Sequence, residues 1–209
     1  MARTPPDPIR LELRDGTPIL VRPIVPDDRQ RLRDGLERLS EHSRYRRFMS
    51  VLRELTEPQL AYLTDLDYEN HMAWAAIDLS LPDQPGVGVA RYIRRDDDAT
   101  KAEVAVTVVD SHQGRGLGTL LLGVLSQTAS ENGIETYIAH VLAENAPMLR
   151  IFAELGGQAE TDGEITRVEI PVPKDPRDLP NTPAGRAFRA IARRMHGSRA
   201  VPSPRGGMR

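Results

Sequence analysis

The pattern of apolar and polar positions divides most of the chain into strands and helices. Apolar residues alternate with polar ones at 9–13 and 17–21, on either side of Asp15-Gly16, which predicts a β-hairpin. Leucines at helical spacing after Pro26 and after Thr56 predict two helices. Apolar runs rich in β-branched residues predict further strands at 71–79, 87–93, 104–109, 134–142 and 165–172. Longer periodic segments predict helices at 119–130 and 146–155.

The resulting order is ββααβββαβαβ, an α/β (α+β) pattern. It predicts a mixed, mostly antiparallel sheet with helices on both faces. The passage from the strand at 104–109 through a helix to the strand at 134–142 should be a right-handed parallel crossover.

Composition sets the outer limits of the domain. Residues 1–8 are a proline-rich segment that we expect to be a flexible leader, and residues 9–173 hold the folded domain. Prolines recur from Pro173 onward, so residues 174–209 are expected to be a linker and basic tail with one possible helix at 184–195. Residues 181–209 carry seven of the 28 basic residues and no acidic one, which leaves residues 1–180 with a net charge of −9. The arginines of this segment have no aromatic residues interleaved among them, so a nucleic-acid partner is not expected.

Other composition features exclude several classes of protein. Cysteine is absent, so there is neither a disulfide nor a thiolate site. The longest uncharged apolar stretch, 117–129, is shorter than the roughly 20 residues of a membrane helix. No signal peptide is apparent at the N-terminus, and we therefore expect a cytoplasmic protein that does not bind membranes. No histidine and carboxylate residues have metal-site spacing, so no metal is expected.

A glycine-rich loop is the strongest candidate for a binding site. It reads Gln113-Gly114-Arg115-Gly116-Leu117-Gly118 and lies between the most β-prone run of the chain and a long helix that starts near Thr119. Free backbone N–H groups at a helix N-terminus attract anions, and glycines let a phosphate approach them. The P-loop pattern requires Lys-Ser or Lys-Thr after the last glycine, and the dinucleotide pattern requires a glycine where Thr119 stands. Both nucleotide interpretations fit poorly.

The loop resembles the Gln/Arg-x-x-Gly-x-Gly/Ala motif of the GCN5-related N-acetyltransferases (GNAT). The resemblance covers about residues 10–172 and implies the GNAT fold, with a parallel strand pair that splays apart. It implies that residues 113–119 wrap the pyrophosphate of the cosubstrate acetyl-CoA, and that Val106 and Val108 pair with its pantetheine arm. The segment 145–156 is similar to the family's later motif, which implies a cofactor contact from Asn145. The alternative is that Asn145 is an ordinary helix N-cap, since it stands just before Ala146-Pro147 at the start of a predicted helix. Phe152 stands where many members have a proton-donating Tyr.

Acetyl transfer to an amine needs a base, since an alkylamine with a pKa near 10.4 is almost fully protonated at neutral pH. Ala102-Glu103-Val104-Ala105-Val106 resembles the same stretch in the catalytic domain of bacterial protein-lysine acetyltransferases, which implies that Glu103 is the base. Its apolar neighbours predict a raised pKa. The alternative is a strand-end carboxylate that faces water and pairs with Lys101 or Arg91. The N–H of Val106 is the candidate for polarising the thioester carbonyl.

Further side chains and functions stay open at this level. His71 could be a second base, His112 could cap the turn before the loop, and His140 could be a core or rim residue. The acceptor is expected to be a primary amine, either a protein lysine or a small cationic molecule. A non-catalytic acyl-CoA-binding module is the other alternative, and Phe152 gives it weight. The oligomeric state is left undetermined by the sequence.

Overall fold

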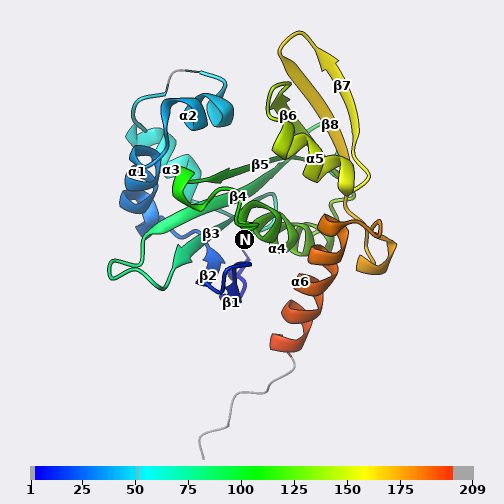
Figure 1. Cartoon of the computed structure of the whole chain (residues 1–209), viewed down its shortest axis with the longest axis horizontal. Coiled ribbons are helices and arrows are strands. Elements are labelled where there is room, and N and C mark those ends of the chain that lie inside the picture. Colours follow the sequence, from blue (N-terminus) through cyan, green and yellow to red (C-terminus); the bar gives the residue numbers. More distant parts are fainter. Residues whose placement is uncertain (1–2, 51, 200–209) are drawn as a thin grey trace, which may run out of the picture.

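A single eight-stranded sheet forms the body of the protein (Figure 1). The computed structural model describes residues 3–50 and 52–199. The strand order is β1-β2-β3-β4-β5-β6-β8-β7. The strands are β1 (Ile9–Glu12), β2 (Pro18–Pro23), β3 (His71–Asp78), β4 (Gly86–Arg94), β5 (Lys101–Val108), β6 (Thr136–Leu142), β7 (Gln158–Asp162) and β8 (Ile165–Pro171). The helices are α1 (Arg29–Glu37), α2 (Glu41–Phe48), α3 (Glu57–Thr64), α4 (Leu117–Glu131), α5 (Ala146–Glu154) and α6 (Pro183–Arg199).

The sheet is mixed, as the sequence predicts. Neighbouring strands pair antiparallel except for β5 and β6, which are parallel and joined through α4. The parallel pairing joins Lys101–Glu103 to Thr136–Ile138 and then stops. The two strands separate beyond that point, and the expected splayed pair is confirmed.

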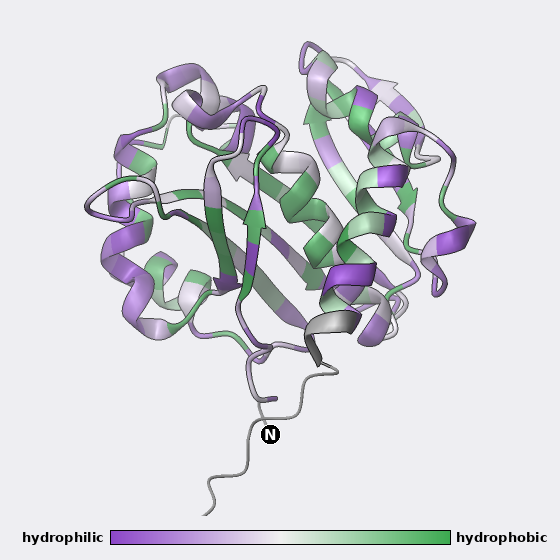
Figure 2. Ribbon diagram, turned by 60° about the horizontal axis from the view of Figure 1, so that its bottom comes forward, coloured by the Kyte–Doolittle hydropathy of each residue, from purple (hydrophilic) through white to green (hydrophobic). Residues whose placement is uncertain are grey.

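Helices cover both faces of the central strands. Alternate residues of a strand point to opposite faces. On β4, Gly88 faces α4, where a Cβ would lie 2.9 Å from Leu121 Cδ1, and its neighbour Val89 faces the side covered by α1. Figure 2 shows the central helix and the strands behind it as largely hydrophobic, whereas the rim helices carry more polar residues. The core therefore lies between the sheet and α4.

The C-terminal helix is part of the folded body, which corrects the prediction of a linker and tail. The helix expected at 184–195 exists as α6, but it packs along α4 and against α5. Phe188, Ile191 and Met195 are buried there, and Gly123 of α4 has no room for a Cβ beside Ile191. The arginines of the tail after residue 199 lie outside the described residues. The sequence predicts this helix only as a possible one. The apolar residues on one face of α6 hold it against α4.

Two elements were not predicted. Strand β7 is exposed at every position, so it has no alternation of apolar and polar residues to reveal it. Helix α2 lies in the basic segment 41–50, where charged side chains hide the apolar positions. Its start is fixed by Ser40, whose hydroxyl accepts from the N–H of Ser43.

The described part of the leader is held against the body. The backbone N–H of Arg3 donates to the carbonyl of Asp67 at 3.0 Å, and its guanidinium bonds Asn132 and Glu69. These contacts hold Arg3 against the body, where a flexible leader was expected, and residues 1–2 lie outside the described part. In the described ranges, no helix has both the length and the apolar character needed to cross a membrane.

Candidate functional site

The separation of β5 from β6 leaves one edge of β5 open. Val109 donates its N–H to the carbonyl of Val87, just past the end of the β4–β5 ladder. In an antiparallel pair, hydrogen-bonded and non-hydrogen-bonded residue pairs alternate. The pairs Val108–Gly88 and Val106–Ala90 are therefore of the second kind. The N–H groups of Val106 and Val108 point away from β4 into the open splay, available to an extended ligand.

The glycine loop ends in an uncapped helix. Gly114 and Gly116 have φ of 73° and 88°, a left-handed conformation that favours glycine. Gly116 is the N-cap of α4, and since glycine has no side chain, the cap accepts no side-chain hydrogen bond from the first turn of that helix. The N–H groups of the first turn therefore form the positive end of the helix dipole, and no capping side chain accepts their hydrogen bonds. This arrangement is suited to a phosphate group.

Gln113 and Asp110 tie the loop to α2. The Gln113 amide donates to Val108 O at 3.0 Å and to Ser43 Oγ at 3.1 Å. The Asp110 carboxylate accepts from the hydroxyls of Ser40 and Ser43, at 2.8 and 2.9 Å. The side chain of Gln113 thus positions the loop and the end of β5 and does not need to touch a ligand itself.

His112 is a structural residue behind the loop. It is 5% exposed, and its Nε2 lies 2.9 Å from Asp78 Oδ2. Burial raises the pKa of Asp78, but hydrogen bonds from Ser80 and His112 outweigh it and lower the pKa overall. The turn before the loop is therefore anchored to the end of β3, which is close to the capping role expected for His112.

The side chain of Arg115 is bound by the turn between β1 and β2. Its Nε donates to Asp15 Oδ2 at 2.7 Å, and its Nη2 bonds the hydroxyl of Thr17, both on the β1–β2 turn. The hydrogen bond from Arg115 holds the pKa of Asp15 far below its ordinary value. The Arg115 side chain is therefore engaged by this turn and does not line the groove that runs past the glycine loop. Arg14, which the sequence analysis missed, lines the groove in its place.

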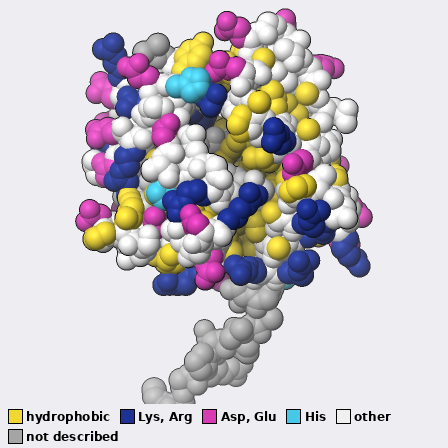
Figure 3. Space-filling model, viewed as in Figure 1, with side chains coloured by type: hydrophobic (Ala, Val, Ile, Leu, Met, Phe, Trp, Pro, Cys, Tyr) yellow, Lys and Arg dark blue, Asp and Glu magenta, His cyan; other side chains and the backbone are white. Residues whose placement is uncertain are grey.

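A groove of about 560 Å³ runs past the loop and the open edge of β5. We call it the main groove. Of the predicted cofactor residues, it brings together Val106, Val108, Gln113, Gly114, Gly116, Leu117, Gly118, Thr119 and Asn145. Figure 3 shows this face hollowed down its middle, with several Lys and Arg side chains beside the hollow.

The charge of the main groove is positive. Its arginines are Arg14, Arg46, Arg47 and Arg150. Its carboxylate, Glu154, accepts a hydrogen bond from the N–H of Ala184 at 2.8 Å, so that α6 partly neutralises it. A long ligand with several phosphates fits this field together with the uncapped helix. The residues present therefore fit a coenzyme A thioester.

Asn145 is a helix cap that also lines the main groove. It is the N-cap of α5, where its Oδ1 accepts from the N–H of Met148 at 3.4 Å, and it also lines the main groove. Phe152 is 3% exposed and packs in the core, and it has no proton to give.

Glu103 lines a second cavity, of about 270 Å³, at the splay. We call it the splay cavity; Val106 and Asn145 line both it and the main groove. The side chain of Glu103 is 55% exposed and lies 3.4 Å from Arg95 Nη1. The apolar surroundings expected for Glu103 are absent, and its partner is Arg95 in place of Lys101 or Arg91.

His71 is a poor candidate for a base. His71 Nε2 lies 2.7 Å from Arg91 Nη1. Burial and the charge of Arg91 lower the pKa of His71 to about 4. Because Nε2 of His71 is bonded to Arg91, it is not free to accept a proton from a substrate. His140 is exposed on the rim of the splay cavity, which agrees with the expected rim position. In residues 3–50 and 52–199, no group of three or more acidic, histidine or cysteine side chains is arranged to hold a metal.

The sequence analysis also missed the arginines that converge at the splay. Arg46 and Arg47 come from α2, and Arg91 comes from β4. A charged residue within the apolar run 87–93 was the one available signal, because a buried arginine in a strand calls for a partner.

Comparison with known proteins gives one consistent family. A family model for the acetyltransferase (GNAT) domain matches residues 19–158. Acetyltransferase Pat of Mycolicibacterium smegmatis is 37% identical over 167 residues, 79% of this chain and 49% of Pat. An acetyltransferase of Pseudomonas aeruginosa is 34% identical over 152 residues, 72% of this chain and 81% of the relative.

A solved structure agrees with these relatives. The crystal structure of the GNAT domain of PAT from S. lividans superposes with a TM-score of 0.71 at 31% identity, covering 78% of this chain and 96% of that domain. The chain spans about half the length of Pat from M. smegmatis. Together with the splayed sheet and the glycine loop, these matches show that the chain belongs to the GNAT acetyltransferase family.

Proposed function

We propose that this protein transfers the acetyl group of acetyl-CoA to a primary amine, and that the amine is a lysine side chain of a protein. The observation that carries the proposal is the continuity of three features along the main groove. They are the uncapped N-terminus of α4 at Gly116, the positive lining, and the unpaired N–H groups of β5. A thioester carrier with a pyrophosphate at one end and amide groups in its arm matches all three.

The chain's own groups then have separate roles. The first-turn amides of α4, from Leu117 to Thr119, receive the pyrophosphate, and Arg115 contributes its backbone alone. The N–H of Val108 pairs with the pantetheine arm. The N–H of Val106, further along the open edge, receives the thioester oxygen and stabilises the negative charge that develops on it.

The reaction needs a neutral amine. Glu103 takes the proton through a water molecule, since its exposed carboxylate stands at the mouth of the splay cavity. The amine nitrogen forms a bond to the acyl carbon and loses its extra proton to water, the bond from that carbon to sulfur breaks, and the sulfur leaves with the electron pair. Because Phe152 cannot donate a proton, water protonates the departing thiolate.

The choice of a protein lysine rests on the relatives. Pat of M. smegmatis and PAT of S. lividans align over more than three quarters of this chain. The acidic body, with −9 on residues 1–180, favours a cationic acceptor in any case. A small cationic amine is the competing acceptor. A cytoplasmic location is part of the proposal, because both acetyl-CoA and its protein acceptors must meet there.

The test is release of CoA from acetyl-CoA in the presence of a cell lysate or a panel of free amines, with acetylated products identified by mass spectrometry. We expect lysine-acetylated proteins to appear, and a Glu103→Gln variant to lose about 10²-fold or more in rate. The matched control is Glu135→Gln, an exposed carboxylate paired with Lys174 away from both cavities. Products confined to free amines would contradict the protein acceptor. Tight binding of acetyl-CoA without turnover would contradict the transferase and indicate a non-catalytic acyl-CoA-binding module.

A further inference from the structure

Two arginines next to the splay have no carboxylate partner among the described residues. Arg91 is 5% exposed, and its guanidinium bonds two neutral groups, His71 Nε2 at 2.7 Å and the carbonyl of Leu63 at 3.0 Å. Arg47 makes neither an ion pair nor a hydrogen bond within residues 3–50 and 52–199. Its Cζ lies 5.0 Å from the centroid of the Phe48 ring, a cation–π arrangement.

A buried guanidinium (Arg91) that feels the positive charge of a partly buried one (Arg47) is costly. Burial, and to a smaller extent the positive charge of Arg47, lowers the pKa of Arg91 to about 9. Burial also lowers the pKa of Arg47. A guanidinium taken out of water is normally matched by an anion, and its planar fork suits a carboxylate. The geometry therefore calls for a negative group that the folded chain does not supply.

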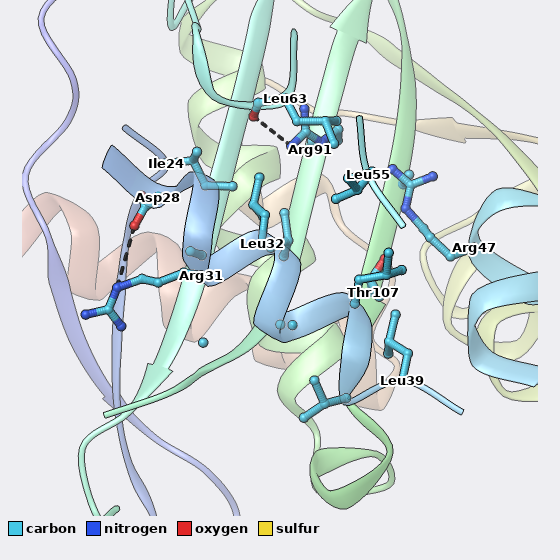
Figure 4. Close-up of a pocket in the computed structure, with 18 of the residues that line it drawn as sticks. Ile24, Asp28, Arg31, Leu32, Leu39, Arg47, Leu55, Leu63, Arg91 and Thr107 are labelled. Atoms are coloured by element: carbon cyan, nitrogen blue, oxygen red, sulfur yellow. Dashed lines mark hydrogen bonds and ion pairs between the residues drawn. The ribbon is translucent and has the colours of Figure 1, made fainter. Parts of the chain in front are cut away.

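Both arginines line a third cavity, of about 100 Å³, between α1 and the sheet (Figure 4). We call it the α1 cavity. It is largely apolar, with Leu32, Leu55 and Val89 on its walls. Its other charged groups are already matched, because Arg22 and Arg31 both face Asp28. The volume is several times what one water molecule needs.

The α1 cavity continues the path of the acyl group. Arg47 lines all three cavities, and Arg91 and Ala105 line both the α1 cavity and the splay cavity. Val106, whose N–H receives the thioester oxygen in the proposed function, lines the splay cavity next to them. An acyl chain longer than acetyl therefore leads from Val106 toward the two guanidinium groups.

We propose that Arg47 and Arg91 form a subsite for the terminal carboxylate of a dicarboxylic acyl group, so that the protein accepts a four-carbon dicarboxylic acyl-CoA such as succinyl-CoA. This inference rests on the proposed function. The terminal carboxylate takes no part in bond making, and transfer again forms the nitrogen–carbon bond and breaks the carbon–sulfur bond. The apolar walls enclose the methylene groups, and the two arginines neutralise the charge.

The test measures binding of acetyl-CoA, butyryl-CoA and succinyl-CoA to the full chain by calorimetry, without acceptor. Butyryl has the same number of carbons as succinyl and lacks the charge. A hydrogen-bonded charge pair corresponds to about ten- to a hundredfold in affinity. We expect succinyl-CoA to bind at least about tenfold more tightly than butyryl-CoA. That ratio should fall close to one in Arg47→Met.

Arg47 is the primary variant because it gives up no hydrogen bond, whereas Arg91→Met also loses the bond to Leu63. Arg31→Met is the matched control, since Arg31 lines the same cavity but already faces Asp28 at 3.8 Å. It should keep the preference for succinyl-CoA.

Equal affinity for butyryl-CoA and succinyl-CoA, or a ratio that Arg47→Met leaves unchanged, overturns the inference, whereas acetyl-CoA binding in the same experiment leaves the proposed cosubstrate site standing. Arg47→Met could instead leave thioester binding unchanged and slow only the acetylation of a lysine peptide that has a glutamate beside the lysine. In that case Arg47 recognises a carboxylate of the acceptor, and the inference is also overturned. Failure of all three thioesters to bind refutes the proposed function and the subsite together.

Discussion

Replacing Gly118 with alanine should separate the stability of the protein from its affinity for CoA. Gly118 lies in the first turn of α4, its φ is not in the left-handed region, and a Cβ there would meet Val108 Cγ2 at 3.8 Å, an ordinary contact. Alanine in a helix is more stable than glycine by about 0.5–1 kcal/mol. Gly118→Ala should therefore raise the free energy of unfolding by that amount, or Tm by roughly 1–4 °C for a chain of this size.

The same methyl group stands in the main groove beside the amides proposed to hold the pyrophosphate. Loss of one hydrogen bond to a charged group costs about 1.5–3 kcal/mol, which corresponds to about ten- to a hundredfold weaker CoA binding. Gly116→Ala provides the contrast. Its φ of 88° costs a residue with a Cβ about 1–2 kcal/mol, so this variant should lose both stability and affinity.

Urea unfolding without ligand measures the first quantity, and calorimetric titration with CoA measures the second. Wild-type affinity in Gly118→Ala would refute the placement of the pyrophosphate at this helix terminus. A Gly118→Ala protein that is less stable than wild type in the absence of CoA would show that the backbone at Gly118 is not helical, contrary to the structure.

Three further predictions concern single side chains. Arg115→Ala should change the affinity for CoA less than about threefold, because a surface ion pair with Asp15 contributes little and the side chain avoids the groove; a larger loss in calorimetry would place this guanidinium on the ligand. Phe188→Ala should lower the free energy of unfolding by about 3–5 kcal/mol, since the ring is buried against α4, and urea unfolding unchanged by it would mean that α6 is a detached tail. Hydrogen bonds from residues 69–71 outweigh burial and lower the pKa of Asp67 to about 2, so its contribution to stability is complete above pH 4 and is lost as the pH falls toward 2. The stability of Asp67→Asn should vary less than that of wild type across this interval, and identical acid unfolding profiles would contradict the assignment.

The sequence by itself determined the elements whose signals are local. The hairpin at Asp15-Gly16, the apolar strand that ends at Val108, the glycine loop and the helix after it were predicted from neighbouring residues alone. A tight turn, a left-handed backbone position and an amphipathic repeat depend on the residues within a few positions of one another. The family resemblance of the loop then predicted the parallel splayed pair correctly. The base Glu103 stays a prediction.

The tertiary structure decided where the side chains point and which distant segments meet. Arg115 turns to a carboxylate 100 positions away in the chain, a contact that no local pattern contains. Strand β7 has no apolar face, and it exists because β8 offers it an edge. Arg47 and Arg91 are 44 positions apart, and they become neighbours through the packing of α2 against β5. Local patterns report the preferences of the backbone, whereas the direction and charge environment of a side chain depend on contacts that form when the whole chain folds.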